Sequence, residues 1–296
     1  MNRQLKLAII SSGIAISVLF PQVSRARTVE QEIKETGVLK VGIREDSPLF
    51  GFGSDKVGYC TDFANSLAEN LSQKLGKTIK VDLVKSTTQN RWELVQDGTV
   101  HLECGPNTIM LEREQKYGIK FSKPFFVTAT QVFVSTNTTE ESLKTGTIGI
   151  IQGTTNEQEF RLIYPDEQIK DSFENRSEGI NAVQDQKIEG FASDGILLAG
   201  TASVLEIDPE KYTLATPLFN NRPLCAAYGM ILPEGQKNSQ WHDTVNSWIA
   251  KSVQGAKVWE TWFNNLLPYV GLVLEACQTS QPNSNNLQNS TQLESL

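Results

Sequence analysis

The first third of the chain alternates between two hydrophobic periods. Residues 38–43 and 78–84 are rich in β-branched side chains and alternate in polarity, as half-buried strands do. Between them, from Phe63 to Leu75, an apolar residue recurs every four positions, which predicts a helix capped by Thr61 or Asp62 and ended by Gly76. A short helix over 90–96 and a strand over 100–103 follow. Strands that alternate with helices predict an α/β lobe with a largely parallel sheet.

A second α/β series begins after a long extended run over 125–135. Another extended run covers 224–232. Two extended runs that bracket an inserted lobe predict that the chain crosses twice between the lobes. The expected elements between the runs are strands over 147–151 and 190–193 and helices over 155–163, 179–183 and 195–205, and after the second run helices over 241–250 and 258–267.

The two ends of the chain differ from the rest. Arg3 and Lys6 precede an apolar run over 7–20, and small residues follow it, which predicts a cleaved signal peptide over 1–26 and a periplasmic protein. An uncleaved membrane anchor is the alternative, although a spanning helix needs ~20 apolar residues and the run has about fourteen. Residues 278–296 are mostly Gln, Asn and Ser, so we expect a disordered tail.

Composition excludes several classes of protein. With 39% hydrophobic and 21% charged residues, the 296-residue chain can bury a core, which rules out global disorder. The length fits two lobes of ~100 to 150 residues. The formal net charge of −7 lacks the basic footprint of a nucleic-acid-binding protein, so no nucleic-acid partner is expected.

The residues that carry metal and catalytic chemistry are few. Four cysteines in an exported chain indicate one or two structural disulfides or buried free thiols, and they permit three pairings. His101 and His242 are the only histidines, and no zinc spacing, nucleophile elbow, phosphate loop or dinucleotide fingerprint occurs. The sequence therefore predicts a protein that binds a molecule without a metal or cofactor, rather than an enzyme.

Eight short motifs occur in an order that resembles the family 3 periplasmic solute-binding proteins of amino-acid ABC transporters. The resemblance extends over 38–267 and is greatest to the glutamate/aspartate-binding members. The motifs are VLKVGIR (38–44) followed by Phe50, GYCTDF (58–63), QNR (89–91), ECGPNT (103–108) followed by Glu112 and Arg113, FS (121–122), FFV (125–127), QGTT (152–155) and SD (193–194).

The resemblance implies the type II two-lobed periplasmic-binding-protein fold, with two hinge strands and the ligand in the cleft between α/β lobes. Residues 29–127 and 229–277 would form lobe 1, and 130–226 would form lobe 2. The implied function is a monomeric subunit that captures a free amino acid and delivers it to an ABC permease by hinge closure. An exported dehydratase-like enzyme on the same fold and a soluble amino-acid sensor are the alternatives.

The resemblance assigns the ligand's α-amino-acid group to five residues. Arg113 would bind the α-carboxylate, because a planar guanidinium can donate two parallel hydrogen bonds. Thr155 and the amide of Thr108 would donate to the same group. The hydroxyl of Thr108 and the carbonyl of Pro106 would bind the α-ammonium, which Asp194 would neutralise. The alternatives are a surface ion pair for Arg113 with a neighbouring glutamate, and helix caps for Thr155 and Asp194.

Four more residues match positions of the acidic-ligand binders. Arg44, Arg91 with Thr88, and Arg176 would face the ligand's side chain, and three guanidinium groups favour an acidic side chain, glutamate or aspartate. Structural roles are the alternative for each arginine.

The implied fold also selects one disulfide pairing. It places Cys60 and Cys104 together near the cleft rim, and it places Cys225 at the second crossing, which the C-terminal helices cover as far as Cys277. The expected bridges are therefore Cys60–Cys104 and Cys225–Cys277.

Overall fold

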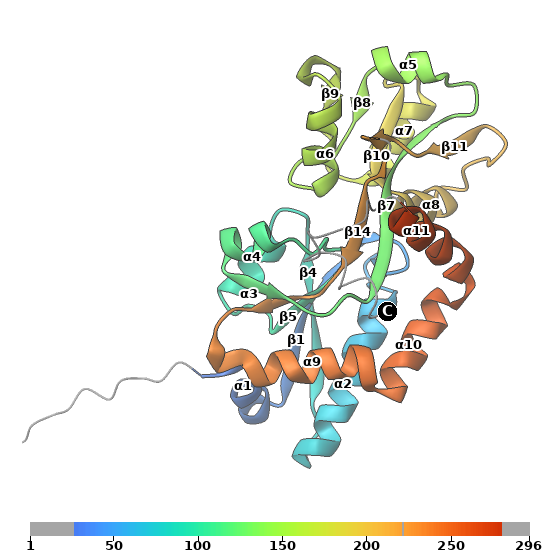
Figure 1. Ribbon diagram of the computed structural model, residues 1–296. Helices are drawn as coiled ribbons and strands as arrows, with labels where there is room; N and C mark the ends of the chain where they lie inside the picture. Colours follow the sequence, from blue (N-terminus) through green and yellow to red (C-terminus); the bar gives the residue numbers. More distant parts are fainter. Residues whose placement is uncertain (1–26, 221, 280–296) are drawn as a thin grey trace, which may run out of the picture.

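The structure, a computed structural model, describes residues 27–220 and 222–279 and consists of two lobes joined by two strands (Figure 1). The expected signal peptide and residues 280–296 of the expected tail lie outside the described residues. In the part of the chain that is described, no helix is long and apolar enough to cross a membrane.

Lobe 1 is built on a five-stranded sheet of order β4-β1-β5-β15-β6. The central strand β1 pairs in parallel with β4 and β5, whereas β15 is antiparallel to both of its neighbours. The strands are β1 (Val38–Arg44), β4 (Lys80–Ser86), β5 (Leu102–Cys104), β6 (Ile119–Phe121) and β15 (Ile231–Pro233). The helices of this lobe are α1 (Val29–Thr36), α2 (Tyr59–Leu75), α3 (Arg91–Gln96), α4 (Leu111–Tyr117), α9 (Ser239–Lys251) and α10 (Val253–Phe263).

Lobe 2 has its own sheet, of order β11-β7-β10-β8-β9. Strands β8, β9 and β10 are parallel, and β7 is antiparallel to β10. The strands are β7 (Phe126–Ser135), β8 (Ile148–Gly149), β9 (Ile169–Lys170), β10 (Gly190–Asp194) and β11 (Tyr212–Ala215). The helices are α5 (Glu140–Thr145), α6 (Thr155–Ile163), α7 (Arg176–Gln184) and α8 (Gly195–Val204).

Two strands carry the chain between the lobes. The first part of β7 pairs antiparallel with β14 (Cys225–Tyr228), and the later part of β7 joins the sheet of lobe 2. In Figure 1 both strands run from one lobe to the other. The two-lobed α/β fold with two crossings is therefore confirmed.

An aromatic cluster lies at the base of these crossings. Phe50, Phe126 and Tyr228 contact one another edge-on or stacked, with ring centroids 5.5 to 6.1 Å apart. Tyr59 stacks on Phe125 at 5.1 Å. All five side chains are at most 1% exposed, and burying a large apolar side chain contributes ~1.5 to 3 kcal/mol. This packing fixes where both strands leave lobe 1 and so positions the residues between the lobes.

The start of α2 differs from the expectation. The helix begins at Tyr59, so neither Thr61 nor Asp62 is its cap. The Thr61 hydroxyl instead donates to the carbonyl of Lys56. Gly58 precedes the helix with φ 159°, and a Cβ there would lie 2.4 Å from the backbone of Phe50, so close approach and not a side-chain cap defines this end. The expected end is confirmed, because Gly76 has the left-handed φ of 61°.

Several elements lacked a usable pattern in the sequence. They are the helices α1, α4 and α5, the hairpin of β2 (Asp46–Ser47) and β3 (Gly51–Phe52), and α11 (Leu267–Thr279). Helix α11 extends through the first two residues of the expected disordered tail.

Both expected disulfides are confirmed, and none of the four cysteines is free. Cys60–Cys104 joins α2 to β5 inside lobe 1, and Cys225–Cys277 joins β14 to α11. The second bridge attaches the C-terminal helix to one of the two crossing strands.

Candidate ligand-binding site

In lobe 1 the predicted residues follow three neighbouring strands. Arg44 ends β1, Thr88 follows β4, and Arg91 begins the next helix, α3. Pro106 and Thr108 lie in the loop after β5, and both are buried. The carboxyl ends of parallel strands lie at one edge of a sheet, where α/β proteins bind their ligands, so this topology brings the five residues to one edge.

In lobe 2 the same principle positions three residues. Thr155 begins α6 directly after the strand β8 and its short loop, Arg176 begins α7, and Asp194 ends β10. Each is at most 7% exposed. The N-termini of α6 and α7 follow strands of lobe 2 and so lie at the carboxyl edge of its sheet. Free amides at a helix N-terminus favour a negatively charged group.

The two sets meet between the lobes. The hydroxyl oxygens of Thr108 and Thr155 are 3.2 Å apart. Arg91 donates from Nη2 to the carbonyl of Gly153 at 3.4 Å. The structure therefore brings the predicted residues of both lobes into one interlobe site, in a conformation in which the lobes touch.

Four buried guanidinium groups dominate this site. Arg44, Arg91, Arg113 and Arg176 are 1 to 6% exposed. Burial, and then the charges of Arg44 and Arg113, lower the pKa of Arg91 to about 9. Among the described residues, Nε of Arg44, Nε of Arg91 and Nη1 of Arg176 have no hydrogen-bond partner. Unpartnered buried donors are costly, so these three atoms are available to an acceptor that is not part of the chain.

Arg113 is not a surface residue, so its alternative interpretation is wrong. It donates from Nη1 to the carbonyl of Thr108 at 3.5 Å, and its guanidinium lies 5.6 Å from the centre of the Trp92 ring. Glu114, a proposed surface partner, instead forms an ion pair with Lys120 at 2.7 Å. Burial lowers the pKa of Arg113.

The cap proposed for Thr155 is also wrong, whereas Asp194 does occupy the N-cap position of α8. Thr154 caps α6, because its hydroxyl accepts from the amide of Glu157 at 3.2 Å. The carboxylate of Asp194 makes no capping bond to α8. It accepts instead from Asn156 at 3.0 Å and from the hydroxyl of Tyr228.

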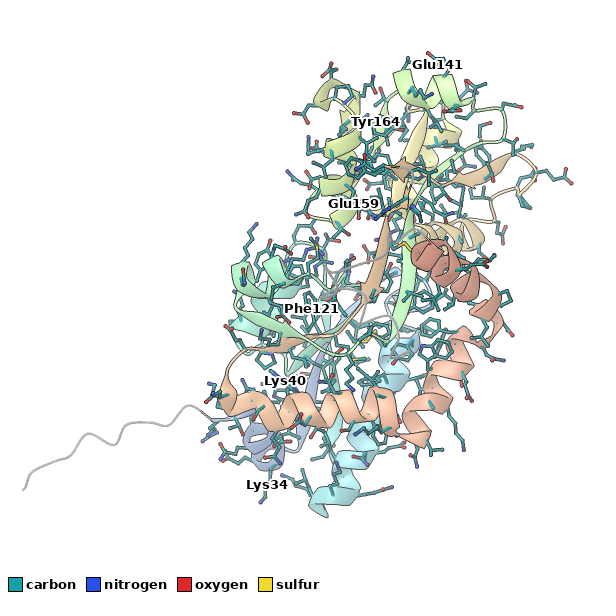
Figure 2. The ribbon with its side chains drawn as sticks, viewed as in Figure 1. Lys34, Lys40, Phe121, Glu141, Glu159 and Tyr164 are labelled. Carbon is teal, nitrogen blue, oxygen red and sulfur yellow. A yellow bond between two sulfur atoms is a disulfide. The ribbon has the colours of Figure 1, made fainter. Side chains whose placement is uncertain are left out.

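A second carboxyl group lies close to Asp194. Glu159 accepts a hydrogen bond of 2.6 Å from Thr130, whose hydroxyl also accepts from Asn156 at 2.7 Å. Figure 2 shows Glu159 in the part of lobe 2 that faces lobe 1. Burial raises the pKa of Glu159 to about 7, and the charge of Asp194 adds to this effect.

Besides Thr130, Asn156 and Glu159, the sequence analysis missed five residues of this site. Asn107 accepts a hydrogen bond from Arg91 at 3.2 Å, and Ser193 accepts one from Arg176 at 2.9 Å. The hydroxyl of Tyr228 donates to the carboxylate of Asp194. Glu103 is fully buried, and this burial raises its pKa. Asp46 lies 2.8 Å from Arg44, and although burial opposes ionisation, the charges of the two nearby arginines hold its pKa at about 2.

These omissions have different causes. Asn107 and Ser193 adjoin predicted site residues, and Asp46 follows Arg44 by two positions, so a search of the flanking polar residues would have found all three. Tyr228 contacts Asp194 across 34 positions, and no local pattern in the sequence indicates that contact.

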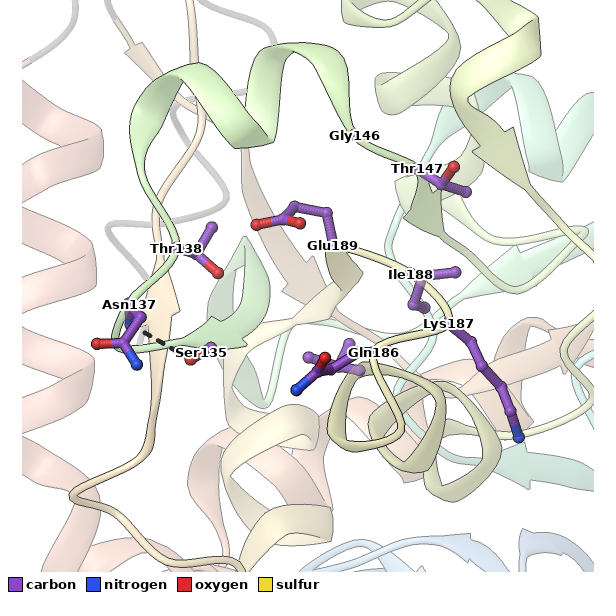
Figure 3. A pocket seen from close by; sticks show the side chains of 10 residues that line it. Ser135, Asn137, Thr138, Gly146, Thr147, Gln186, Lys187, Ile188 and Glu189 are labelled. Atoms are coloured by element: carbon purple, nitrogen blue, oxygen red, sulfur yellow. Dashed lines mark hydrogen bonds between the residues drawn. The ribbon is translucent and has the colours of Figure 1, made fainter.

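A separate polar depression occurs on lobe 2, with a volume of about 540 Å³ (Figure 3). It contains no arginine, and the one carboxylate that lines it, Glu189, accepts a hydrogen bond from Ser142. It lacks the charges that the interlobe site offers to an amino acid. Its lining residues are Ser135, Asn137, Thr138, Gly146, Thr147, Val183, Gln186, Lys187, Ile188 and Glu189.

The described residues include no cluster of three or more His, Cys, Asp or Glu side chains that could hold a metal ion. The polar groups of the interlobe site are instead arginines, hydroxyls, amides and isolated carboxylates.

Comparisons with known proteins agree with this arrangement. Residues 39–265 match the family described as bacterial extracellular solute-binding proteins, family 3. The glutamate/aspartate import solute-binding protein of Escherichia coli (strain K12) is 26% identical over 249 residues, which cover 80% of each chain. The glutamine-binding protein of Geobacillus stearothermophilus is 27% identical over 213 residues, or 70% of this chain and 77% of the relative.

A solved structure shares the fold. The crystal structure of the solute receptor for L-cysteine of Neisseria gonorrhoeae has a TM-score of 0.66 and 26% identity, and the match covers 82% of this chain and 95% of that chain. The segment that matches the family contains every residue of the interlobe site described above.

Proposed function

Because the chain belongs to the bacterial extracellular solute-binding proteins, family 3, we propose that it captures a free amino acid between its lobes outside the cytoplasm and delivers it to an ABC permease. The relatives named above include binders of glutamate, aspartate and glutamine, and the related solved structure is a receptor for cysteine. Their names support an amino-acid ligand without selecting one.

We propose an acidic amino acid, glutamate or aspartate, as the preferred ligand. Arg113, with Thr108 and Thr155, binds the α-carboxylate, while Asp194 and the carbonyl of Pro106 bind the α-ammonium. Arg44, Arg91 and Arg176 bind the side-chain carboxylate, and Thr88, which accepts from Arg44 at 2.8 Å, positions the first of them.

One observation carries this proposal. Donor atoms of Arg44, Arg91 and Arg176 are buried without a hydrogen-bond partner among the described residues. Asp46 supplies one negative charge to Arg44 and Arg176, so the three guanidinium groups keep an excess of positive charge. Excess charge in a buried site is costly, and a side-chain carboxylate reduces that cost. A ligand with a cationic side chain, such as arginine, would add repulsion to the same three groups.

A thermal-shift panel on ligand-stripped protein tests the proposal. A ligand present at 100 times its dissociation constant adds ~2.7 kcal/mol to the free energy of unfolding, which corresponds to a rise of several degrees in Tm. We expect glutamate and aspartate to give the largest rise among the free amino acids. No rise with any amino acid would contradict a role in capture.

The same protein tests the enzymatic alternative. Glu159 is the described group that best fits a general acid, because burial raises its pKa to about 7. We propose that it is a structural part of the Asp194 network and that incubation with prephenate or arogenate gives no turnover. Product formation that Glu159→Gln abolishes would contradict a purely binding role.

A further inference from the structure

Asp46 is an acidic residue inside the set of arginines assigned to an acidic ligand. Its Oδ2 lies 2.8 Å from Nη2 of Arg44 in lobe 1 and 4.0 Å from Nη1 of Arg176 in lobe 2. Its Oδ1 accepts a hydrogen bond of 3.1 Å from the hydroxyl of Ser47. The carboxylate therefore belongs to lobe 1 but faces a cation from each lobe.

The position of this carboxylate is fixed by the backbone. Asp46 lies in β2, which forms a two-residue antiparallel pair with β3, so its backbone is held against Phe52. A carboxylate on a short side chain from a fixed strand acts as a permanent counter-ion. Its side chain is 30% exposed, whereas those of Arg44 and Arg176 are at most 5% exposed.

Neither arginine depends on Asp46 alone for its position. Arg44 also donates to Thr88 at 2.8 Å, and Arg176 donates from Nε to Ser193 at 2.9 Å. Removing the negative charge of Asp46 therefore leaves both guanidinium groups with a neutral partner. What changes is the net charge that a ligand's side chain meets.

We propose that Asp46 determines specificity by competing with the ligand's side-chain carboxylate for Arg44 and Arg176. This inference rests on the proposed function. A ligand carboxylate must displace or repel Asp46, whereas the amide of glutamine can accept from an arginine without that repulsion. Asp46 thus reduces the ratio of the dissociation constants for glutamine and glutamate. A neutral residue at this position increases that ratio.

The chain offers a matched control in the adjacent residue. Glu45 forms ion pairs with Lys56 at 3.1 Å and Lys85 at 2.7 Å and contacts none of the site arginines. Glu45→Gln removes the same charge one position away. It therefore reproduces any general effect of net charge without changing the charge next to Arg44 and Arg176.

The test is the ratio of the dissociation constants for glutamine and glutamate, measured by calorimetry on ligand-stripped protein. Without Asp46, the ligand's side-chain carboxylate no longer shares Arg44 and Arg176 with a second negative charge. Charges this close in a partly buried site interact strongly, so we expect Asp46→Asn and Asp46→Ser to raise this ratio at least ~10-fold. Glu45→Gln should leave the ratio unchanged. A role of Asp46 that is only structural would weaken both ligands equally and would not move the ratio.

Each result is decisive. A ratio within threefold of wild type in folded Asp46 variants, or a lower ratio, overturns the inference while the proposed function stands. If Asp46→Asn does not fold, Asp46→Ser decides by the same ratio, because it removes the same charge. Failure of wild-type protein to bind either amino acid would instead overturn the proposed function.

Discussion

Arg113 has the properties that a ligand anchor needs. It is 6% exposed, it makes one long hydrogen bond of 3.5 Å to the carbonyl of Thr108, and the face of Trp92 limits its movement. Its guanidinium is thus oriented by the protein while donors stay available. Such a group loses little conformational entropy when it binds a carboxylate.

Arg113→Ala should weaken amino-acid binding by at least 100-fold. Each hydrogen bond to a charged group contributes ~1.5 to 3 kcal/mol, and two are lost. Calorimetry measures the effect. Arg161→Ala is the control, because Arg161 forms its ion pairs with Glu157, Asp166 and Asp171 within lobe 2. A loss of less than threefold for Arg113→Ala would show that the assignment is wrong.

Glu159 should make the protein less stable as the pH rises. Its pKa is raised from 4.5 to about 7 by burial, so the protonated form is favoured in the folded state. The stability contributed by the neutral carboxyl is complete below pH ~4.5 and is lost as the pH rises through 7. At ~1.4 kcal/mol per pKa unit, with allowance for partial exposure, the loss is on the order of 2 to 3 kcal/mol.

Urea denaturation at pH 5 and pH 8 tests this prediction. Wild type should lose stability between the two values relative to Glu159→Gln, whose amide does not ionise. Glu167 is exposed, so Glu167→Gln is the control. Its stability should change between the two pH values as that of wild type does. Parallel behaviour of Glu159→Gln and wild type would contradict the raised pKa.

At the scale of elements, strongly periodic segments could be predicted from the sequence. Helix α2 has one buried face, and its apolar positions recur with the period of a helix. The first residues of β1 alternate between half-buried and buried, and its last four residues are all buried. Helix α4 could not be predicted, because its seven residues bury only Arg113 and offer no apolar period. The predicted binding residue lies on that unpredicted helix, and family resemblance alone identified it.

Local patterns in the sequence were also insufficient to predict the whole site. Nine ligand-binding residues were expected from the family resemblance, and the structure brings residues from both lobes together. Their partners Asp46 and Tyr228 were not expected, because their roles depend on contacts that only the folded chain creates. Whether the nine residues bind the ligand stays a prediction.

The two disulfides should differ in resistance to reduction. Cys60 and Cys104 are fully buried, whereas Cys225 is exposed and Cys277 is half-buried. Thiol–disulfide exchange requires access of a thiolate to the sulfur. Mild dithiothreitol under native conditions should therefore reduce Cys225–Cys277 first, and alkylation followed by peptide mass spectrometry would locate the new thiols. Labelling of Cys60 and Cys104 before the other pair would contradict the structure.

Loss of the Cys225–Cys277 bridge should lower stability. The bridge closes a loop with a sequence separation of 52, and removing a disulfide costs ~2 to 4 kcal/mol. Helix α11 would keep a polar contact to the crossing strand β7, between Tyr269 and Thr128 at 3.0 Å. The Cys225→Ser, Cys277→Ser variant should therefore show a lower Tm and unchanged ligand specificity. An unchanged Tm would contradict this role of the bridge.

At the scale of the whole molecule, the lobes touch through the residues that are proposed to bind the ligand. The contacts between Thr108 and Thr155 and between Arg91 and Gly153 each join one lobe to the other. Domain closure around ligands is a general property of periplasmic binding proteins. In the described structure the lobes are in contact at the proposed site, which is the arrangement that hinge closure predicts for the ligand-bound protein.

Closure predicts a change in shape when ligand is removed. Few direct contacts hold the lobes together at the site without a ligand, so the ligand-stripped protein should open about β7 and β14. Small-angle X-ray scattering should give a smaller radius of gyration with saturating glutamate than without it. Identical scattering curves in the two states would contradict hinge closure.

The central claim is that the buried arginines select an acidic amino acid. Calorimetric titration of ligand-stripped protein with glutamate, aspartate, glutamine and arginine tests it most directly. The account predicts that glutamate or aspartate binds most tightly, that glutamine binds more weakly, and that arginine binds least, because its guanidinium would meet Arg44, Arg91 and Arg176. Arginine binding as tightly as glutamate would contradict the account.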